Sequence, residues 1–363
     1  MRATWFAAAV SVGTALLSAE AAAEPYLAVR TGFKCSMCHV NPTGAGMRNA
    51  FGTAWARSEL PRRIVGADAE DGAWTSEVNR WLAVGGNVRS GLAYVDTPGR
   101  DEEAEFGISR ANLYAALRAI PGLLTVYVDE QVAPGGATAR EAYALLTPSN
   151  GRFTVKAGKF FLPYGLRLED DSAFIRQITG INMDTPDHGV ELGLELPRWS
   201  TQLAVTNGTA GGGDDDTNKQ TSLKAAFVNR LWRIGASYSY NGAALGDREM
   251  QGLYGGLRTG PISWLAEVDF ITDDTPAGER ETYVSLLEGN WRAAHGHNLK
   301  LSYEYFDPAD DVDEDERERY SLVWEAAPMQ MLQARFGIRI YNGVPQEPAS
   351  DRDEVFAELH LFF

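Results

Sequence analysis

The feature that most constrains the fold is a repeated alternation of polar and apolar residues between Leu82 and Phe363. From Leu299 to Tyr305, for example, every second side chain is apolar. A period of two places successive side chains on opposite faces of a β-strand. The sequence therefore predicts sixteen strands, near 82–95, 106–118, 122–132, 140–147, 152–161, 188–196, 199–207, 220–229, 232–241, 248–258, 262–271, 281–292, 297–306, 318–326, 329–341 and 353–363.

The breaks between these segments also alternate, in length and in charge. Short breaks such as Pro148–Asn150 and Gly260-Pro261 are followed by long acidic ones such as 208–219 and 307–319. Short turns at one end and long loops at the other are typical of bacterial outer-membrane barrels, which have an even strand number. We expect an all-β fold, a 16-stranded antiparallel outer-membrane β-barrel in contact with membrane lipid and with both termini in the periplasm. A soluble β-sandwich is the alternative.

The strand pattern also assigns side chains to faces. The last segment, EVFAELHLFF, places alternate apolar residues and Phe363 on one face, as in a closing strand. The break 162–189 is the longest, and it is predicted either to fold into the lumen as a short helix or to form a surface loop. Residues expected at the membrane interfaces are Tyr238, Tyr254, Trp264, Tyr303 and Trp324. Residues expected in the lumen are Glu191, Glu195, Glu267, Asp269, Arg335 and Arg339.

Charge and the N-terminus narrow the class of protein further. The chain has 49 acidic and 33 basic residues, a net charge of −16, so nucleic acid is excluded as a partner. Arg2, the apolar run 5–17 and small residues up to Ala23 are typical of a secretory signal peptide. The predicted organisation is a signal peptide at 1–23, a small segment at 24–75 and the barrel at 80–363.

Both cysteines of the chain lie in the motif CSMCH, in which Cys35 and Cys38 precede His39. This is the CxxCH signature of c-type haem attachment, with His39 as the ligand of the iron. Two thiols add across the two vinyl groups of one haem, so the spacing predicts one covalent haem c. A disulfide would leave His39 unexplained, a thioredoxin-like pair needs a βαβ pattern, and zinc needs more ligands.

The sequence leaves the sixth ligand of the iron open. Met47 follows in a stretch expected to be helical, and a methionine would raise the reduction potential. His188, at the end of the longest break, is the second candidate metal ligand. Weaker alternatives are Met183, His295, His297 and His360.

An N-terminal CxxCH motif followed by a barrel in one chain resembles the fused monohaem cytochrome–porins of bacterial iron oxidisers. The resemblance covers the architecture of the mature chain, and CSMCH is its specific motif. It implies electron transfer across the outer membrane, with extracellular Fe(II) as the donor and a periplasmic c-type cytochrome as the acceptor. Only Cys35, Cys38 and His39 carry over from the family to this sequence.

Two functions from different classes follow as hypotheses. In the first, a haem held at or in the barrel moves electrons between an extracellular redox partner and the periplasm, as an electron-transfer protein or an iron oxidoreductase. In the second, the chain is a diffusion porin for small solutes with a haem-bearing plug or sensor. The acidic loops favour cations such as Fe(II) through their field, or they are simply solvated.

Overall fold

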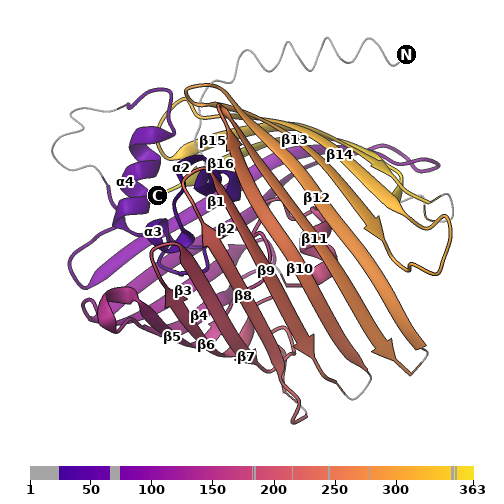
Figure 1. Cartoon of the computed structure of the whole chain (residues 1–363). Helices are drawn as coiled ribbons and strands as arrows, with labels where there is room; N and C mark the ends of the chain where they lie inside the picture. Colours follow the sequence, from indigo (N-terminus) through magenta and orange to yellow (C-terminus); the bar gives the residue numbers. More distant parts are fainter. Residues whose placement is uncertain are drawn as a thin grey trace.

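A computed structural model describes residues 24–65, 74–181, 183, 185–214, 216–243, 246–276, 278–344, 347 and 350–363. The predicted signal peptide, 1–23, lies outside these residues. Sixteen antiparallel strands form one closed barrel, in which each strand pairs with its neighbours in sequence and β16 pairs with β1 (Figure 1). The predicted fold class is confirmed.

The observed strands agree with the predicted segments to within a few residues at each end. They are β1 (Leu82–Asp96), β2 (Glu103–Ile120), β3 (Leu124–Ala133), β4 (Thr138–Leu146), β5 (Phe153–Phe160), β6 (Asp187–Glu195), β7 (Trp199–Thr206), β8 (Gln220–Val228), β9 (Trp232–Asn241), β10 (Asp247–Thr259), β11 (Ile262–Thr275), β12 (Gly278–Ala294), β13 (His297–Asp307), β14 (Arg317–Ala326), β15 (Leu332–Asn342) and β16 (Asp353–Phe362). A 3₁₀ turn, η1 (Ser149–Gly151), joins β4 to β5.

The two faces of the barrel differ as the alternation predicts. On β13, Leu301 is 62% exposed on the outer face whereas the adjacent Lys300 is 4% exposed in the lumen. The outer face is rich in exposed Leu, Val and Trp, which suits contact with lipid. All six polar residues expected in the lumen are buried or half-buried. Tyr254 is a correction, because it is buried and faces the lumen rather than a membrane interface.

Three short helices precede the barrel: α2 (Pro25–Thr31), α3 (Cys35–Cys38) and α4 (Ala50–Glu59). Pro25 begins α2, and Gly32, with a φ of 76°, ends it because a left-handed residue is easiest for glycine. The side chain of Asn49 caps α4 by accepting the N–H of Gly52 at 2.9 Å. No helix in the described residues is both long and apolar enough to span a membrane.

The N-terminal helices lie at the end of the barrel that carries the short turns. The N–H of Arg63 donates to the carbonyl of Pro328 at 3.0 Å, in the turn between β14 and β15. The carbonyl of Pro61 lies 2.6 Å from a ring nitrogen of His295, in the turn between β12 and β13. Inside the ring, α2 packs on β10 and β11 (Figure 1). The described part of the N-terminal segment therefore occupies the lumen at this end.

The longest break enters the lumen from the other end. It contains α5 (Phe174–Thr179), which packs on β11, β12 and β13. An apolar core joins it to α2, to α4 and to the inner face of the barrel. Its buried members are Tyr26, Leu27, Val29, Ala56, Leu60, Tyr164, Leu168, Ala173, Phe174, Ile175, Met250, Leu265, Ile271, Val284, Leu286, Phe306 and Tyr341.

Candidate cofactor site

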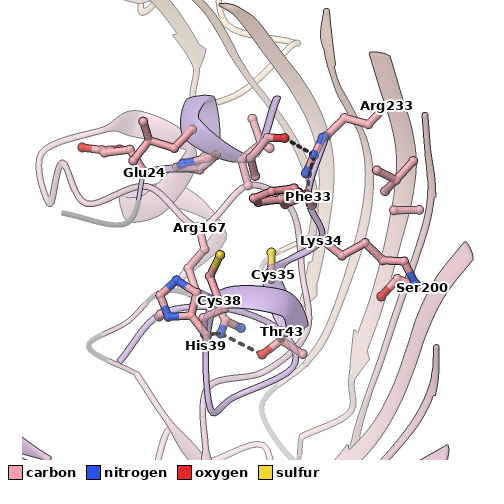
Figure 2. Close-up of a pocket in the computed structure, with 18 of the residues that line it drawn as sticks. Glu24, Phe33, Lys34, Cys35, Cys38, His39, Thr43, Arg167, Ser200 and Arg233 are labelled. Atoms are coloured by element: carbon pink, nitrogen blue, oxygen red, sulfur yellow. Dashed lines mark hydrogen bonds between the residues drawn. The ribbon is translucent and has the colours of Figure 1, made fainter. Parts of the chain in front are cut away.

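The CSMCH motif forms α3 and the residue that follows it. The N–H of His39 donates to the carbonyl of Cys35 at 3.0 Å, so one helical turn fixes the spacing of the motif. Both thiols are free, and Figure 2 shows them pointing to the same side of α3, with the His39 ring beside Cys38. The structure thus brings together the three residues predicted to hold the haem.

Close packing of α4 holds the motif in place. The N–H of Asn49 donates to the carbonyl of Cys38 at 2.9 Å. A Cβ atom on Gly52 would lie 2.1 Å from that same carbonyl oxygen, so only glycine lets the two helices approach this closely. The site is therefore built by backbone contacts rather than by a flexible loop.

A cavity that is partly open to solvent lies beside the motif. It is lined by Cys35, Cys38 and His39 and by residues of α2, α4, the longest break and strands β7 to β11. Its apolar wall consists of Leu27, Phe33, Trp55, Leu60, Val228 and Leu265. A large apolar cavity with a few polar groups is the usual form of a cofactor site.

The His39 ring is suited to metal ligation. Its exposed fraction is 9%, and burial together with the charge of Arg48 lowers its pKa to about 4, although the backbone of Ala45 and Gly46 acts in the opposite direction. The imidazole is therefore neutral at physiological pH, which is the form that binds a metal. Its Nδ1 is buried and makes no well-formed hydrogen bond within the described residues.

The Cys38 thiol does not have the character of a thiolate. Burial raises the pKa of Cys38 to about 11. Reactive redox cysteines and zinc ligands need a lowered pKa, which comes from nearby cations, a helix N-terminus or the metal. No cluster of three or more metal-binding His, Cys, Asp or Glu residues occurs in the described part of the chain. A protonated Cys38 thiol on an apolar wall fits attachment of a large apolar group.

A buried polar network anchors the segment that follows the motif. Asn41, fully buried, donates to Glu141 at 2.8 Å and accepts from Lys156 at 3.0 Å. Lys156 also pairs with Glu191 at 2.9 Å. Nearby, the N–H of Met47 donates to the Tyr127 hydroxyl at 2.9 Å. Because β3, β4, β5 and β6 supply these partners, the barrel wall holds the site rigidly.

The structure does not bring either predicted sixth ligand to this cavity. Met47 is 2% exposed and packs among Tyr114, Tyr127 and Tyr143, away from the cavity lining. His188 is exposed on β6, on the same outer face as Val190. The identity of the sixth ligand therefore stays a prediction, and neither side chain lines the cavity. The weaker candidates lie outside the lining as well: Met183, His295, His297 and His360.

Several cavity residues were not predicted from the sequence. They are Phe33, Arg167, Lys224, Arg233 and Tyr254. The position of Tyr254 could have been predicted. Leu253 and Leu257 lie on the outer face of β10, and Tyr254, next to Leu253, must point to the opposite face, into the lumen. The same alternation applies to Lys224 and Arg233, which lie beside the exposed Leu223 and Ile234. Phe33 and Arg167 lie between elements, where the sequence carries no such signal.

Comparison with solved structures places the barrel among the bacterial outer-membrane porins by fold. An anion-selective porin from Comamonas acidovorans aligns with a TM-score of 0.63 and 12% identity, over 78% of this chain and 99% of that one. OmpT, an outer membrane protein of Vibrio cholerae, gives 0.61 at 12% identity, over 79% and 99%. OprB from Pseudomonas putida gives 0.60 at 11% identity, over 78% and 94%.

The likeness extends to the fold alone, because these identities are low. No model of a known protein family matches the chain, and no curated protein matches its sequence. The chain therefore has the closed barrel of an outer-membrane porin, with a helical segment and a cavity inside it.

Proposed function

We propose that the chain binds one c-type haem covalently through Cys35 and Cys38, with His39 as a ligand of its iron, and transfers electrons across the outer membrane. One observation carries this proposal: two free thiols and a buried neutral histidine face a single apolar cavity inside a barrel. The hydrocarbon core of a bilayer is about 30 Å thick, so electron transfer across it needs a redox centre within a protein.

The residues present fit the group. The two thiols have the spacing that haem attachment requires, and the neutral imidazole leaves a nitrogen for the iron. The cavity lies directly against both thiols and the His39 ring, and its apolar wall suits the face of a porphyrin. When bound, the haem supplies reversible one-electron chemistry at its iron.

The chain itself positions the ligands and excludes water. Packing of α3 on α4 fixes His39, and the Asn41 network fixes both helices against the barrel wall. The apolar side chains of α2, α4, β8 and β11 form a lining of low polarity. Such a lining and the buried axial histidine are the means by which a protein sets the potential of a haem.

The proposed partners depend on the orientation that we expect for the barrel in the outer membrane. With the short turns in the periplasm, the cavity end meets a periplasmic c-type cytochrome and the acidic loops meet the extracellular partner, for which we propose Fe(II). The loop 308–316, between β13 and β14, carries a dense run of Asp and Glu, and its field raises the local concentration of cations.

A diffusion porin is the second candidate, and the comparisons favour it because the similar barrels are porins. The apolar core that α2, α4 and α5 form inside the lumen is an observation against it. Open porins have a polar, water-filled interior. A porin function would therefore require these elements to move.

Proteoliposomes distinguish the two functions. Vesicles with trapped oxidised cytochrome c receive Fe(II) or another membrane-impermeant reductant outside, and a second set measures leak of a trapped small sugar. We expect reduction of the trapped cytochrome with wild type and none with the Cys35→Ala, Cys38→Ala double variant. Sugar leak without electron transfer would overturn the proposal in favour of the porin.

A further inference from the structure

The charge of the cavity lining is opposite to that of the chain. The whole chain has a net charge of −16, yet the lining holds five basic side chains and one carboxylate. That carboxylate, Glu24, already has cationic partners outside the lining, since it pairs with Lys300 at 3.3 Å and lies 3.8 Å from Arg335. The five basic residues are Lys34, Arg48, Arg167, Lys224 and Arg233.

Two of these cations have no carboxylate within ion-pair distance in the described part of the chain. Arg233, on β9, donates only to the carbonyls of Ala28 and Phe33, at 2.6 and 2.7 Å. Lys224, on β8, donates to the carbonyls of Tyr164 and Gly165. By contrast, Lys34 at the rim pairs with Glu195 at 2.7 Å.

The groups that face these two cations do not neutralise them. Glu267 on β11 acts on Lys224 from beyond ion-pair distance, and its Oε2 already accepts the N–H of Leu166. Around Arg233 the facing titratable groups are Cys35 and Tyr254, which are neutral when protonated. Backbone dipoles alone offset a buried charge poorly, so an arrangement of this kind favours an anionic ligand.

We infer that Arg233 and Lys224 bind the anionic groups of an apolar ligand in the cavity, which for a c-type haem are its two propionates. This assignment rests on the proposed function. It explains why an acidic chain gathers basic residues around this apolar cavity. It also makes these two residues positioning groups that raise the reduction potential, because a nearby positive charge favours the reduced, more negative form of the cofactor.

A redox titration of the purified full chain, followed by its optical spectrum, tests the assignment. We expect a lower reduction potential in Arg233→Met and in Lys224→Met, and a potential near that of wild type in Arg233→Lys, which keeps the charge. Arg258→Met is the matched control, because Arg258 also donates to a carbonyl of α2, that of Arg30 at 2.9 Å, but does not line the cavity.

Each outcome decides a different point. An equal shift in Arg258→Met would show that Arg233 acts only by holding α2, and unchanged potentials in both cavity variants would overturn the assignment. Should Arg233→Met not assemble, Lys224→Met still tests the charge, because Lys224 makes no contact with a carbonyl of α2. Wild type without covalent haem, shown by haem staining of a denaturing gel, would refute the proposed function and this assignment with it.

Discussion

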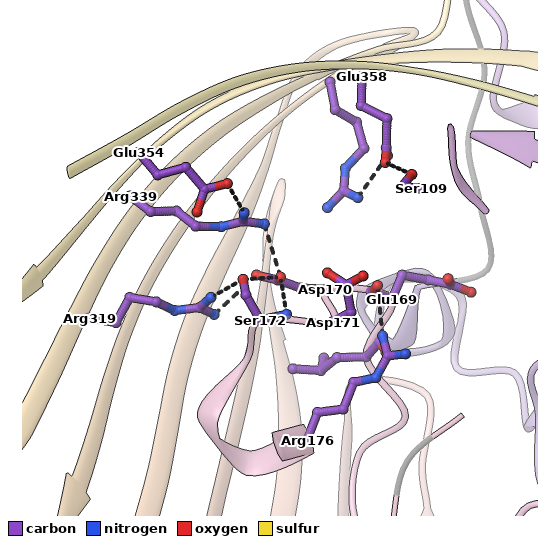
Figure 3. A network of polar contacts seen from close by, with 12 residues as sticks. Ser109, Glu169, Asp170, Asp171, Ser172, Arg176, Arg319, Arg339, Glu354 and Glu358 are labelled. Carbon is purple, nitrogen blue, oxygen red and sulfur yellow. Dashed lines mark hydrogen bonds and ion pairs between the residues drawn. The ribbon is translucent and has the colours of Figure 1, made fainter. Parts of the chain in front are cut away.

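The two ends of the lumen hold their charges in different ways. At the end with the long loops, Asp170 pairs with Arg319 at 3.0 Å and with Arg339 at 2.9 Å (Figure 3). Glu169 pairs with Arg89 at 2.6 Å. At the cavity end, the hydrogen bonds of Arg233 within the described residues go to the backbone carbonyls of Ala28 and Phe33. Asp170 and Glu169 are thus paired within the chain, whereas Arg233 is a cation for which we propose a ligand. The first end should therefore control stability, and the second should control redox chemistry.

The sharpest test of this difference removes a thiol at the cavity end. In Cys38→Ala we expect loss of most covalent haem, because one thioether is lost and His39 is held less firmly. The barrel should still fold, since Cys38 makes no ion pair with the wall in the described residues. Haem staining and heat-modifiable migration on gels measure the two properties, with Ser36→Ala as the control. A Cys38→Ala barrel that fails to fold would contradict the view that the loop end, and not the cavity end, controls stability.

At the opposite end, Arg319→Met should destabilise the barrel strongly and leave the haem spectrum unchanged. Arg319 is buried between Glu304 and Asp170, and both carboxylates lose a partner in the variant. Breaking a buried ion pair costs about 3 to 5 kcal/mol. Denaturant unfolding monitored by tryptophan fluorescence measures the change. Arg280→Met, which removes an exposed pair with Asp273, should alter the unfolding free energy by at most about 1 kcal/mol.

Acid should loosen the loop end first. Burial alone would raise the pKa of Glu169, but Arg89 and Arg110 outweigh it and hold the pKa at about 2, below its ordinary value of 4.5. Its stabilisation is therefore complete above about pH 4.5 and is lost as the pH falls through about 2, with an upper value of about 3 kcal/mol. Protease sensitivity of the longest break at decreasing pH measures this. Glu169→Gln should show a flatter dependence, and an unchanged profile would contradict the assignment.

The smallest effect concerns the contact between α3 and α4. In Gly52→Ala the new methyl group meets the carbonyl oxygen of Cys38, so the two helices must separate. Overpacking of this kind costs about 1 to 3 kcal/mol. We expect lower haem content per barrel, measured by the ratio of haem to protein absorbance. Gly107→Ala is the control, since a Cβ there approaches no atom more closely than 4.0 Å; equal haem loss in both variants would contradict the packing argument.

The barrel was predictable because its signal is local and repeated. Within each strand, the alternation of polar and apolar residues shows which side chains face outward. The assignment around Leu301 or Val190 therefore needs no knowledge of distant residues. The same alternation indicates that His188 lies outside, on the face of Val190, and this position does not support the sequence-based choice of His188 as a ligand. The alternation along a strand predicts which way a side chain points, even when the residue type suggests a role in the lumen.

The cavity was only partly predictable. The spacing of Cys35, Cys38 and His39 is a local signal, and the structure brings the three together. Arg233 and Lys224 reach the same cavity through the register of β8 and β9 and the position of α2 in the ring, which depend on the whole fold. Met47 is directed away because its backbone bonds to Tyr127 on β3, a contact that no short-range pattern reveals.

The seam between β1 and β16 has a consequence for the order in which the molecule is made. The N–H of Phe363 donates to the carbonyl of Gly86 at 3.0 Å, so the ring is closed by the last residue of the chain. The helices that the ring encloses precede β1 in the sequence. The ring around them therefore closes only when the last strand, β16, pairs with the first, β1.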